Sequence, residues 1–195
     1  YHCVEVGTVV GPISADRALL ATGAFSGHGD TSLVGLAVVY ALHTQLHVAL
    51  DVDEADRLAG MPSIISKDAD PTGDLYLTPP VPDPVRPGHH VLKIGMPQDD
   101  HVRVPAADLS AWYRTDGDPA VAARLDGMVR GLLPGLQWTG RWTGSCVTTY
   151  TPTSHPAIDW VGPGVEVGAG RIACCVGGNG FAAKCAPALG GLAAG

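Results

Sequence analysis

The chain has few basic residues and no long apolar run. Its 12 Lys and Arg are scattered singly and are outnumbered by 19 Asp and Glu, giving a formal net charge of −7. Nucleic acids and anionic membranes are bound by clustered Lys and Arg, so neither is expected as a partner. The longest apolar candidate, 33–42, is far shorter than the roughly 18 residues of a membrane span. The start has no Met and no charged segment, so no signal peptide is expected.

Cysteine is sparse and odd in number, and its spacing fits no zinc site. Two of the five cysteines, Cys174 and Cys175, are adjacent in a strand-like run, where neighbouring side chains point to opposite faces. We therefore expect reduced thiols and a cytoplasmic protein.

Common catalytic motifs are also missing. There is no Gly-x-Ser-x-Gly or His-Glu-x-x-His, which disfavours a hydrolase. His43 and His47 are four apart, as for a metal on a helix, but their surroundings are strand-like and lack a carboxylate, so no metal is expected. The stretch 27–30 contains only turn formers. The stretch 168–173 matches a dinucleotide fingerprint formally, yet strand-like residues follow it where a helix should begin, so we expect a tight turn.

What the chain does have is 46% apolar residues, 26 Gly and 16 Pro, which is typical of a packed, loop-rich α/β or α+β protein. Asp118 followed by Pro119 predicts a capped helix over 118–135. Helices are also predicted within 104–114 and over 181–194, a turn at 11–14, and a helical turn or loop at 51–60. Strands are predicted at 4–10, 15–23, 33–52 (one strand or two), 74–81, 90–96, 136–153 and 171–178. This order predicts a mainly antiparallel sheet with parts of another layer.

Lys93 is unusual because it lies in the apolar strand 90–96. Burying an unpaired ammonium is costly, so this side chain is expected either at a sheet edge or in a wet functional cavity. Lys184 closes the stretch Val176–Lys184, VGGNGFAAK, a glycine-rich turn that opens a helix. Such turns bind anions through backbone N–H groups, and the lysine adds positive charge. A solvated surface lysine is the alternative.

Five segments, in order, resemble the FAD-dependent oxidoreductases of the D-amino-acid oxidase and monomeric sarcosine oxidase family. They are LLATGAFS, LYLTPPV, LKIG, CVTTYTPTSHPAIDWVG and VGGNGFAAK. The resemblance covers the C-terminal half of such a protein, and the N-terminal dinucleotide fingerprint is missing, so a fragment is expected. It implies an α/β fold (α+β as a fragment). Residues 1–30 and 141–195 would form part of a Rossmann-like FAD domain, and 31–140 a mostly antiparallel substrate sheet.

The resemblance also implies an activity and a site. FAD would accept a hydride at flavin N5 from an amine or N-methyl amino acid, with Lys93 and Lys184 in catalytic roles. The implied FAD contacts are Thr22, Gly23, Cys146, His155, Gly178, Asn179, Gly180, Phe181 and Lys184. Cys146 occupies the position of the family's flavin-linking cysteine, which requires a thiolate, so its pKa is expected to be lowered by Arg141 or His155. A buried strand cysteine is the alternative.

Two departures from the family leave the substrate and the electron acceptor open. Pro97 stands where sarcosine-oxidising members carry a histidine, and Phe181 and Ala182 replace the His and second Gly of the oxidase loop. The alternative function is a truncated, non-catalytic remnant or binding module that lacks a cofactor. The chain alone is expected to hold FAD poorly, to be inactive and to aggregate through unpaired apolar strands.

Overall fold

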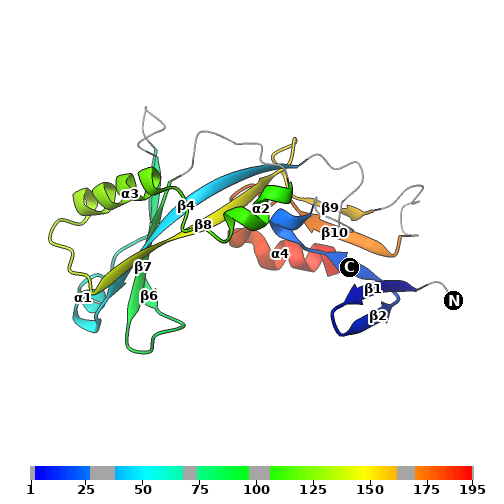
Figure 1. The fold of residues 1–195 in the computed structure, drawn as a ribbon, viewed down its shortest axis with the longest axis horizontal. Coiled ribbons are helices and arrows are strands. Elements are labelled where there is room, and N and C mark those ends of the chain that lie inside the picture. Colours follow the sequence, from blue (N-terminus) through cyan, green and yellow to red (C-terminus); the bar gives the residue numbers. More distant parts are fainter. Residues whose placement is uncertain (1–2, 27–37, 68–73, 97–105, 162–169, 195) are drawn as a thin grey trace. The chain divides into compact units, whose positions relative to one another are not determined.

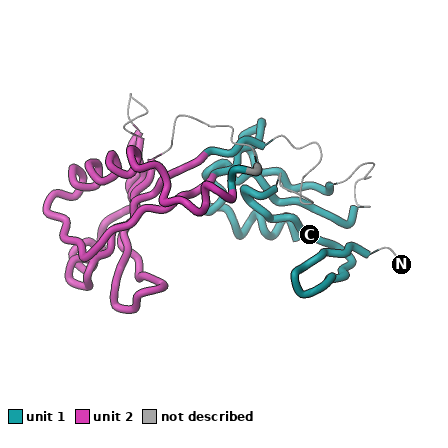
Figure 2. Tube along the Cα trace, in the orientation of Figure 1, with its two compact units in different colours: residues 1–41, 103–109, 148–195 teal, residues 42–102, 110–147 magenta. Residues whose placement is uncertain are grey.

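The computed structural model describes residues 3–26, 38–67, 74–96, 106–161 and 170–194. Predictions for 27–30, for Pro97 and for 168–169 lie outside these residues. The chain forms two compact units (Figure 2). Unit 1 comprises 1–41, 103–109 and 148–195, and unit 2 comprises 42–102 and 110–147.

Unit 2 is built on a five-stranded sheet with the order β5-β6-β7-β4-β8 (Figure 1). The β5–β6, β6–β7 and β7–β4 pairs are antiparallel, as expected for this region. A register shift between Thr78 and Val81 places Pro79 and Pro80 of β6 in an irregularity, which suits residues that cannot donate to the ladder. The strands are β4 (Val39–Leu50), β5 (Ile64–Ser66), β6 (Leu75–Pro82), β7 (His90–Gly95) and β8 (Gly140–Tyr150).

One face of this sheet carries the main hydrophobic core. Alternate residues of β4, β6 and β7 pack there against helices α1 (Val52–Arg57) and α3 (Pro119–Leu132). Asp118 caps α3 by accepting hydrogen bonds from the N–H groups of Ala120 and Val121, so the predicted cap is confirmed. The core contains Leu46, Val48, Leu50, Ala55, Leu58, Leu75, Leu77, Leu92, Ile94, Met96, Leu125 and Val129. The opposite face is therefore the one available to polar residues.

Unit 1 contains a three-stranded sheet with the order β3-β10-β9. Strand β10 (Ile172–Val176) pairs parallel with β3 (Ala18–Leu20) and antiparallel with β9 (Ala157–Trp160). A separate hairpin joins β1 (Val4–Thr8) to β2 (Gly11–Ala15), and a short 3-10 helix, η1, spans Gly23–Phe25. Helix α4 (Ala182–Ala194) follows β10, and α2 (Ala106–Trp112) is a short helix where one was predicted.

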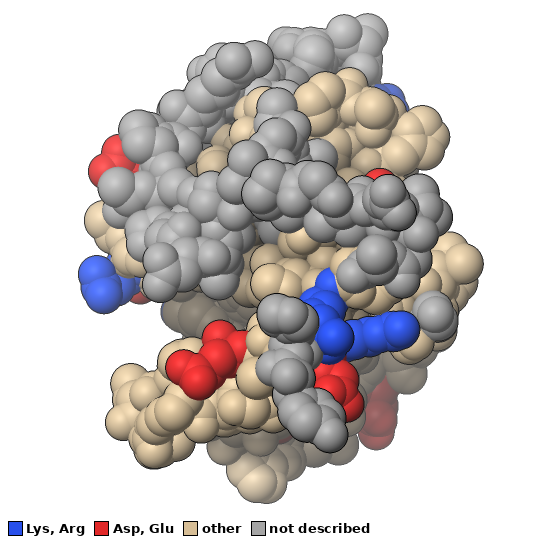
Figure 3. Space-filling model, turned by 90° about the vertical axis from the view of Figure 1, so that its right-hand side faces the viewer, with Lys and Arg blue, Asp and Glu red and all other residues tan. Residues whose placement is uncertain are grey.

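Unit 1 leaves much apolar surface uncovered. Helix α4 has no buried residue, Leu192 is 71% exposed, and Val9 and Val10 at the tip of the first hairpin are almost fully exposed. On the face drawn in Figure 3, basic and acidic side chains of the described residues form small separate groups, not one basic patch. Within the described ranges, no helix is both long and apolar enough to cross a bilayer.

Several predicted elements need correction. The expected turn at 11–14 is strand β2, because its backbone pairs with β1 and that pairing outweighs the local Gly-Pro signal. The strand expected over 15–23 is reduced to β3, and Gly23, with φ of +55°, starts η1. The strand expected over 136–153 begins only at Gly140. Strands β5 and β9 were not predicted.

Candidate functional site

Lys93 lies in the middle of the unit 2 sheet, not at its edge. Strand β7 has β6 on one side and β4 on the other, so the sheet-edge alternative is wrong. Its partners in register are His47 on β4 and Thr78 on β6. Within the described part of the chain, no carboxylate lies within ion-pair distance of Lys93. A half-buried ammonium without a counter-ion is a costly feature in a central strand.

Tyr76 is the aromatic neighbour of this lysine. The Lys93 Nζ lies 5.6 Å from the centroid of the Tyr76 ring, and the Tyr76 hydroxyl accepts a hydrogen bond of 2.9 Å from Gln45 Nε2. The ring occupies the space beside Gly95, where any Cβ would collide with it. Burial raises the pKa of the Tyr76 phenol, and the Gln45 hydrogen bond opposes that rise without cancelling it, so the phenol is protonated at neutral pH.

Cys146 lies on β8, close enough to Lys93 and Tyr76 to interact with both electrostatically. Its carbonyl accepts a hydrogen bond of 3.0 Å from Trp112 Nε1. Burial raises the pKa of the Cys146 thiol, and the Lys93 charge offsets this only in part. The expected lowering by Arg141 or His155 is therefore wrong, because Arg141 is paired with Asp126 and the His155 ring contacts the Thr153 carbonyl.

His47 also lies on this face, although its sequence spacing from His43 pointed only to a possible metal site. Its ring stacks on Trp142 with centroids 5.3 Å apart and planes 6° from parallel, and Arg86 lies 4.6 Å from the Trp142 centroid. Burial lowers the pKa of His47, and the Lys93 charge lowers it further. His47 was expected in a strand, and β4 confirms this. We call the side of the sheet bearing Gln45, His47, Tyr76, Lys93 and Cys146 the polar face.

The glycine-rich loop of unit 1 is held by its asparagine. Asn179 is 2% exposed and has a left-handed backbone, with φ of +49°. Its N–H donates to the Thr149 carbonyl, its Oδ1 accepts from the Thr151 N–H at 2.9 Å, and its Nδ2 donates to the Gly177 carbonyl. Gly177 is itself required, because a Cβ there would collide with the Thr151 methyl. The Asn179 side chain is thus fully used in fixing the loop to the end of β8.

The rest of the glycine-rich loop has backbone N–H groups that are available to a ligand. In the described ranges, the N–H groups of Gly178 and Gly180 have no hydrogen-bond acceptor. These two groups precede the first turn of α4, where the helix dipole favours negative charge. Phe181 is 66% exposed, and Lys184 is exposed in the first turn of the helix.

The remaining predicted contacts also lie in unit 1. The Thr22 hydroxyl donates to Ser26 Oγ at 3.0 Å, and the Ser26 hydroxyl donates to the Gly23 carbonyl at 2.6 Å, so both predicted residues belong to the η1 turn. His155 is exposed in the turn after β8. Lys93 and Cys146, by contrast, are brought together on the polar face of unit 2. The structure therefore groups the predicted residues into two sets, one in each unit.

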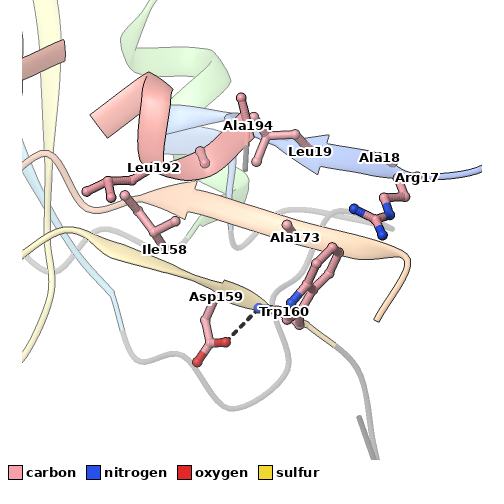
Figure 4. A pocket seen from close by; sticks show the side chains of 10 residues that line it. Arg17, Ala18, Leu19, Ile158, Asp159, Trp160, Ala173, Leu192 and Ala194 are labelled. Carbon is pink, nitrogen blue, oxygen red and sulfur yellow. Dashed lines mark hydrogen bonds between the residues drawn. The ribbon is translucent and has the colours of Figure 1, made fainter. Parts of the chain in front are cut away.

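A cavity of about 420 Å³ in unit 1 contains none of the predicted residues (Figure 4). It lies between β3, β9, β10 and the end of α4, and the Arg17 guanidinium covers the Trp160 ring there at 5.4 Å from its centroid. Its other polar side chain, Asp159, accepts a hydrogen bond from the Trp160 N–H. Ala173, Leu19 and Leu192 make most of its remaining wall apolar.

The chain has the fold of FAD-dependent oxidoreductases of the D-amino-acid oxidase and sarcosine oxidase type, which confirms the fold expected from the motifs. A fructosamine oxidase from Aspergillus fumigatus matches 96% of the chain with a TM-score of 0.66 and 19% identity. A modified fructosyl peptide oxidase from Aspergillus nidulans matches 96% with a TM-score of 0.63 and 21% identity. An L-proline dehydrogenase from P. horikoshii matches 95% with a TM-score of 0.58 and 19% identity.

These likenesses concern the fold. The chain spans only 42%, 44% and 43% of the three proteins, respectively. No protein-family model matches the chain, and no curated protein matches it.

Proposed function

We propose that the chain is part of a flavin-dependent oxidoreductase that oxidises an amine or an N-methyl amino acid. The observation that carries this proposal is Lys93, a half-buried lysine in a central strand with no carboxylate partner in the described residues. Such a charge is costly for the fold, whereas a reaction that develops negative charge beside it would be favoured by it. The resemblance implies a position near flavin N5 for this lysine.

The residues of unit 1 fit FAD as the cofactor. The two unpaired N–H groups at Gly178 and Gly180, at the start of α4, suit a group that becomes negatively charged on reduction. The unit 1 residues that would hold the cofactor are Thr22, Gly23, His155, Gly178, Asn179, Gly180, Phe181 and Lys184, and the proposal adds Cys146 of unit 2. Because its amide is used internally, Asn179 would contribute by shaping the loop. Bound FAD would supply the acceptor for a hydride, which carries the two electrons of the oxidation.

The chain's own side chains would orient the substrate and place charge at the reacting centre. Lys93 would place a positive charge at the reacting centre, favouring electron transfer to oxygen, and Tyr76 would hold its ammonium in place. Lys184 would attract a substrate carboxylate or the reduced flavin. Cys146 would lie against the flavin as a protonated thiol in the resting protein, so a covalent link requires that proton to leave first.

An amine substrate is also supported by the names of the similar structures. Fructosamine, a fructosyl peptide and L-proline are amines or amino-acid derivatives. The polar face has basic residues and no acidic residue in its strands, which suits a substrate that carries a carboxylate. We propose that the protein acts in the cytoplasm, which suits its five free cysteines.

The test is the absorbance spectrum of the protein expressed with the polypeptide encoded upstream of Tyr1. We expect a yellow protein with flavin bands that bleach when an N-methyl amino acid is added without oxygen. The 195 residues alone should bind flavin weakly, because half a cleft cannot offset the cost of ordering so large a ligand. A colourless longer protein, or a stop codon directly upstream, would instead favour the non-catalytic remnant.

A further inference from the structure

In the part of the chain that the structure describes, the polar face has few groups that can accept a proton. The five strands of the unit 2 sheet contain no Asp or Glu. Burial keeps the Tyr76 phenol and the Cys146 thiol protonated by raising the pKa of each. Lys93, as an ammonium, can only donate. Among the described residues, the imidazole of His47 is therefore the basic group directly opposite Lys93 that can take up a proton near neutral pH.

His47 is held in one position with its nitrogens unused. It is the direct partner of Lys93 across β4 and β7, so the two side chains rise from the same face. The stack on Trp142 fixes the ring plane. The residue next to His47 Nε2 is Gly144, which has no side chain to cover this nitrogen. A Cβ at position 144 would lie 3.8 Å from Nε2. In the described part of the chain, neither ring nitrogen of His47 forms a hydrogen bond.

We propose that His47 is the base that accepts the proton leaving the substrate ammonium before amine oxidation; this rests on the function proposed above. An amine arrives mainly as an ammonium ion, which cannot release a hydride from its α-carbon until its nitrogen has a lone pair. The N–H bond breaks, its proton binds His47, and its electron pair stays on the substrate nitrogen. Bound FAD would supply the acceptor for the hydride that the α-carbon then releases with its two electrons, and the substrate would become a protonated imine.

The charges around His47 determine its pH behaviour. Lys93 faces it from β7 and Arg86 lies over its stacking partner, while Tyr76 on β6, Cys146 on β8 and His43 on β4 are the other titratable groups of this face. Burial and the charge of Lys93 both favour the neutral imidazole, and together they lower the pKa of His47. Substrate-dependent reduction should therefore rise with pH through an inflection below about 6.5.

The first experiment measures flavin reduction without oxygen in the full-length protein, from pH 5 to 10. His47→Gln should slow reduction at pH 7 by about 100-fold or more, the usual contribution of a general base. The loss should shrink at high pH, where the amine arrives already neutral, and reoxidation by oxygen should be unchanged. A role in folding alone would produce a loss that does not recover with pH.

His43→Gln is the matched control, because His43 lies on the same strand and side but is not the register partner of Lys93. It should leave the pH profile unchanged. If both variants behave alike, or if only His43→Gln loses the base, the assignment to His47 is wrong.

A second readout does not depend on turnover. Histidine ring carbons labelled with ¹³C report each imidazole pKa by NMR in the full-length protein, with His47→Gln identifying the signal. Lys93→Met should raise the pKa of His47, because it removes the charge that lowers it. An unchanged pKa would overturn the pairing. If the full-length protein binds no flavin, the proposed function is overturned. If it binds flavin and the His47→Gln variant is reduced as fast as wild type, only the present inference is overturned.

Discussion

Replacing Asn179 should loosen the glycine-rich loop and destabilise the end of β8. Asn179→Gly removes two side-chain hydrogen bonds and leaves the Thr151 N–H and the Gly177 carbonyl buried without their partner. Each buried group left unsatisfied costs about 1–3 kcal/mol, so for the two groups we expect a loss of about 2–6 kcal/mol in the free energy of unfolding. Asn179→Ala should cost about 1 kcal/mol more, because alanine disfavours the left-handed backbone found there.

The assay is urea denaturation of the full-length protein together with hydrogen exchange of the Thr151 amide. Both variants should speed exchange at Thr151, and the alanine variant should unfold first. Gln137→Ala is the control: it removes a comparable amide-to-carbonyl hydrogen bond, from Gln137 Nε2 to the Gly135 carbonyl, at an exposed site. It should change stability by no more than about 0.5 kcal/mol. Equal stability of wild type, Asn179→Gly and Asn179→Ala would refute this account of the loop.

Three further predictions concern the proposed site. Gly95→Ala should displace the Tyr76 ring and slow turnover. Gly127→Ala is the control, because this helical position has open space around it, and it should not change turnover. Equal turnover of the two variants would contradict the tight packing of Tyr76 against Gly95. Acid denaturation of the full-length protein should leave flavin attached if Cys146 forms the covalent link, and complete release into the supernatant rules the link out. Lys184→Met should weaken substrate affinity or turnover, and unchanged kinetics would make this exposed residue an ordinary surface lysine.

Local signals predicted the parts of the fold that are formed locally. Helix α3 was identified from Asp118 and Pro119, because a cap is decided by residues within one turn. The hairpin of β6 and β7 followed from two alternating strands and a Pro-rich connection. The prediction of a turn at 11–14 was wrong for the opposite reason. The conformation of this segment depends on pairing with β1, which the Gly and Pro at its start do not reveal.

The site was predictable only in part, because its chemistry depends on register. Lys93 stood out as a charge in an apolar strand, but its central position follows from long-range pairing with β4. His47 was missed as a partner for the same reason. Alternation along β4 could have placed it on one face, and only the pairing puts it opposite Lys93. Likewise, the sequence predicts Asn179 as a cofactor contact, whereas in the structure its side-chain amide forms hydrogen bonds with Thr151 and Gly177.

The central claim is that Lys93 acts at a flavin, and air reoxidation of the reduced full-length protein tests it most directly. Stopped-flow absorbance should show Lys93→Met reoxidising slower than wild type by orders of magnitude while its flavin remains bound. Lys67→Met, which removes an exposed lysine paired with Asp74, should reoxidise like wild type. If Lys93→Met reoxidises as fast as wild type, Lys93 has no role at the flavin and the account of the polar face is contradicted.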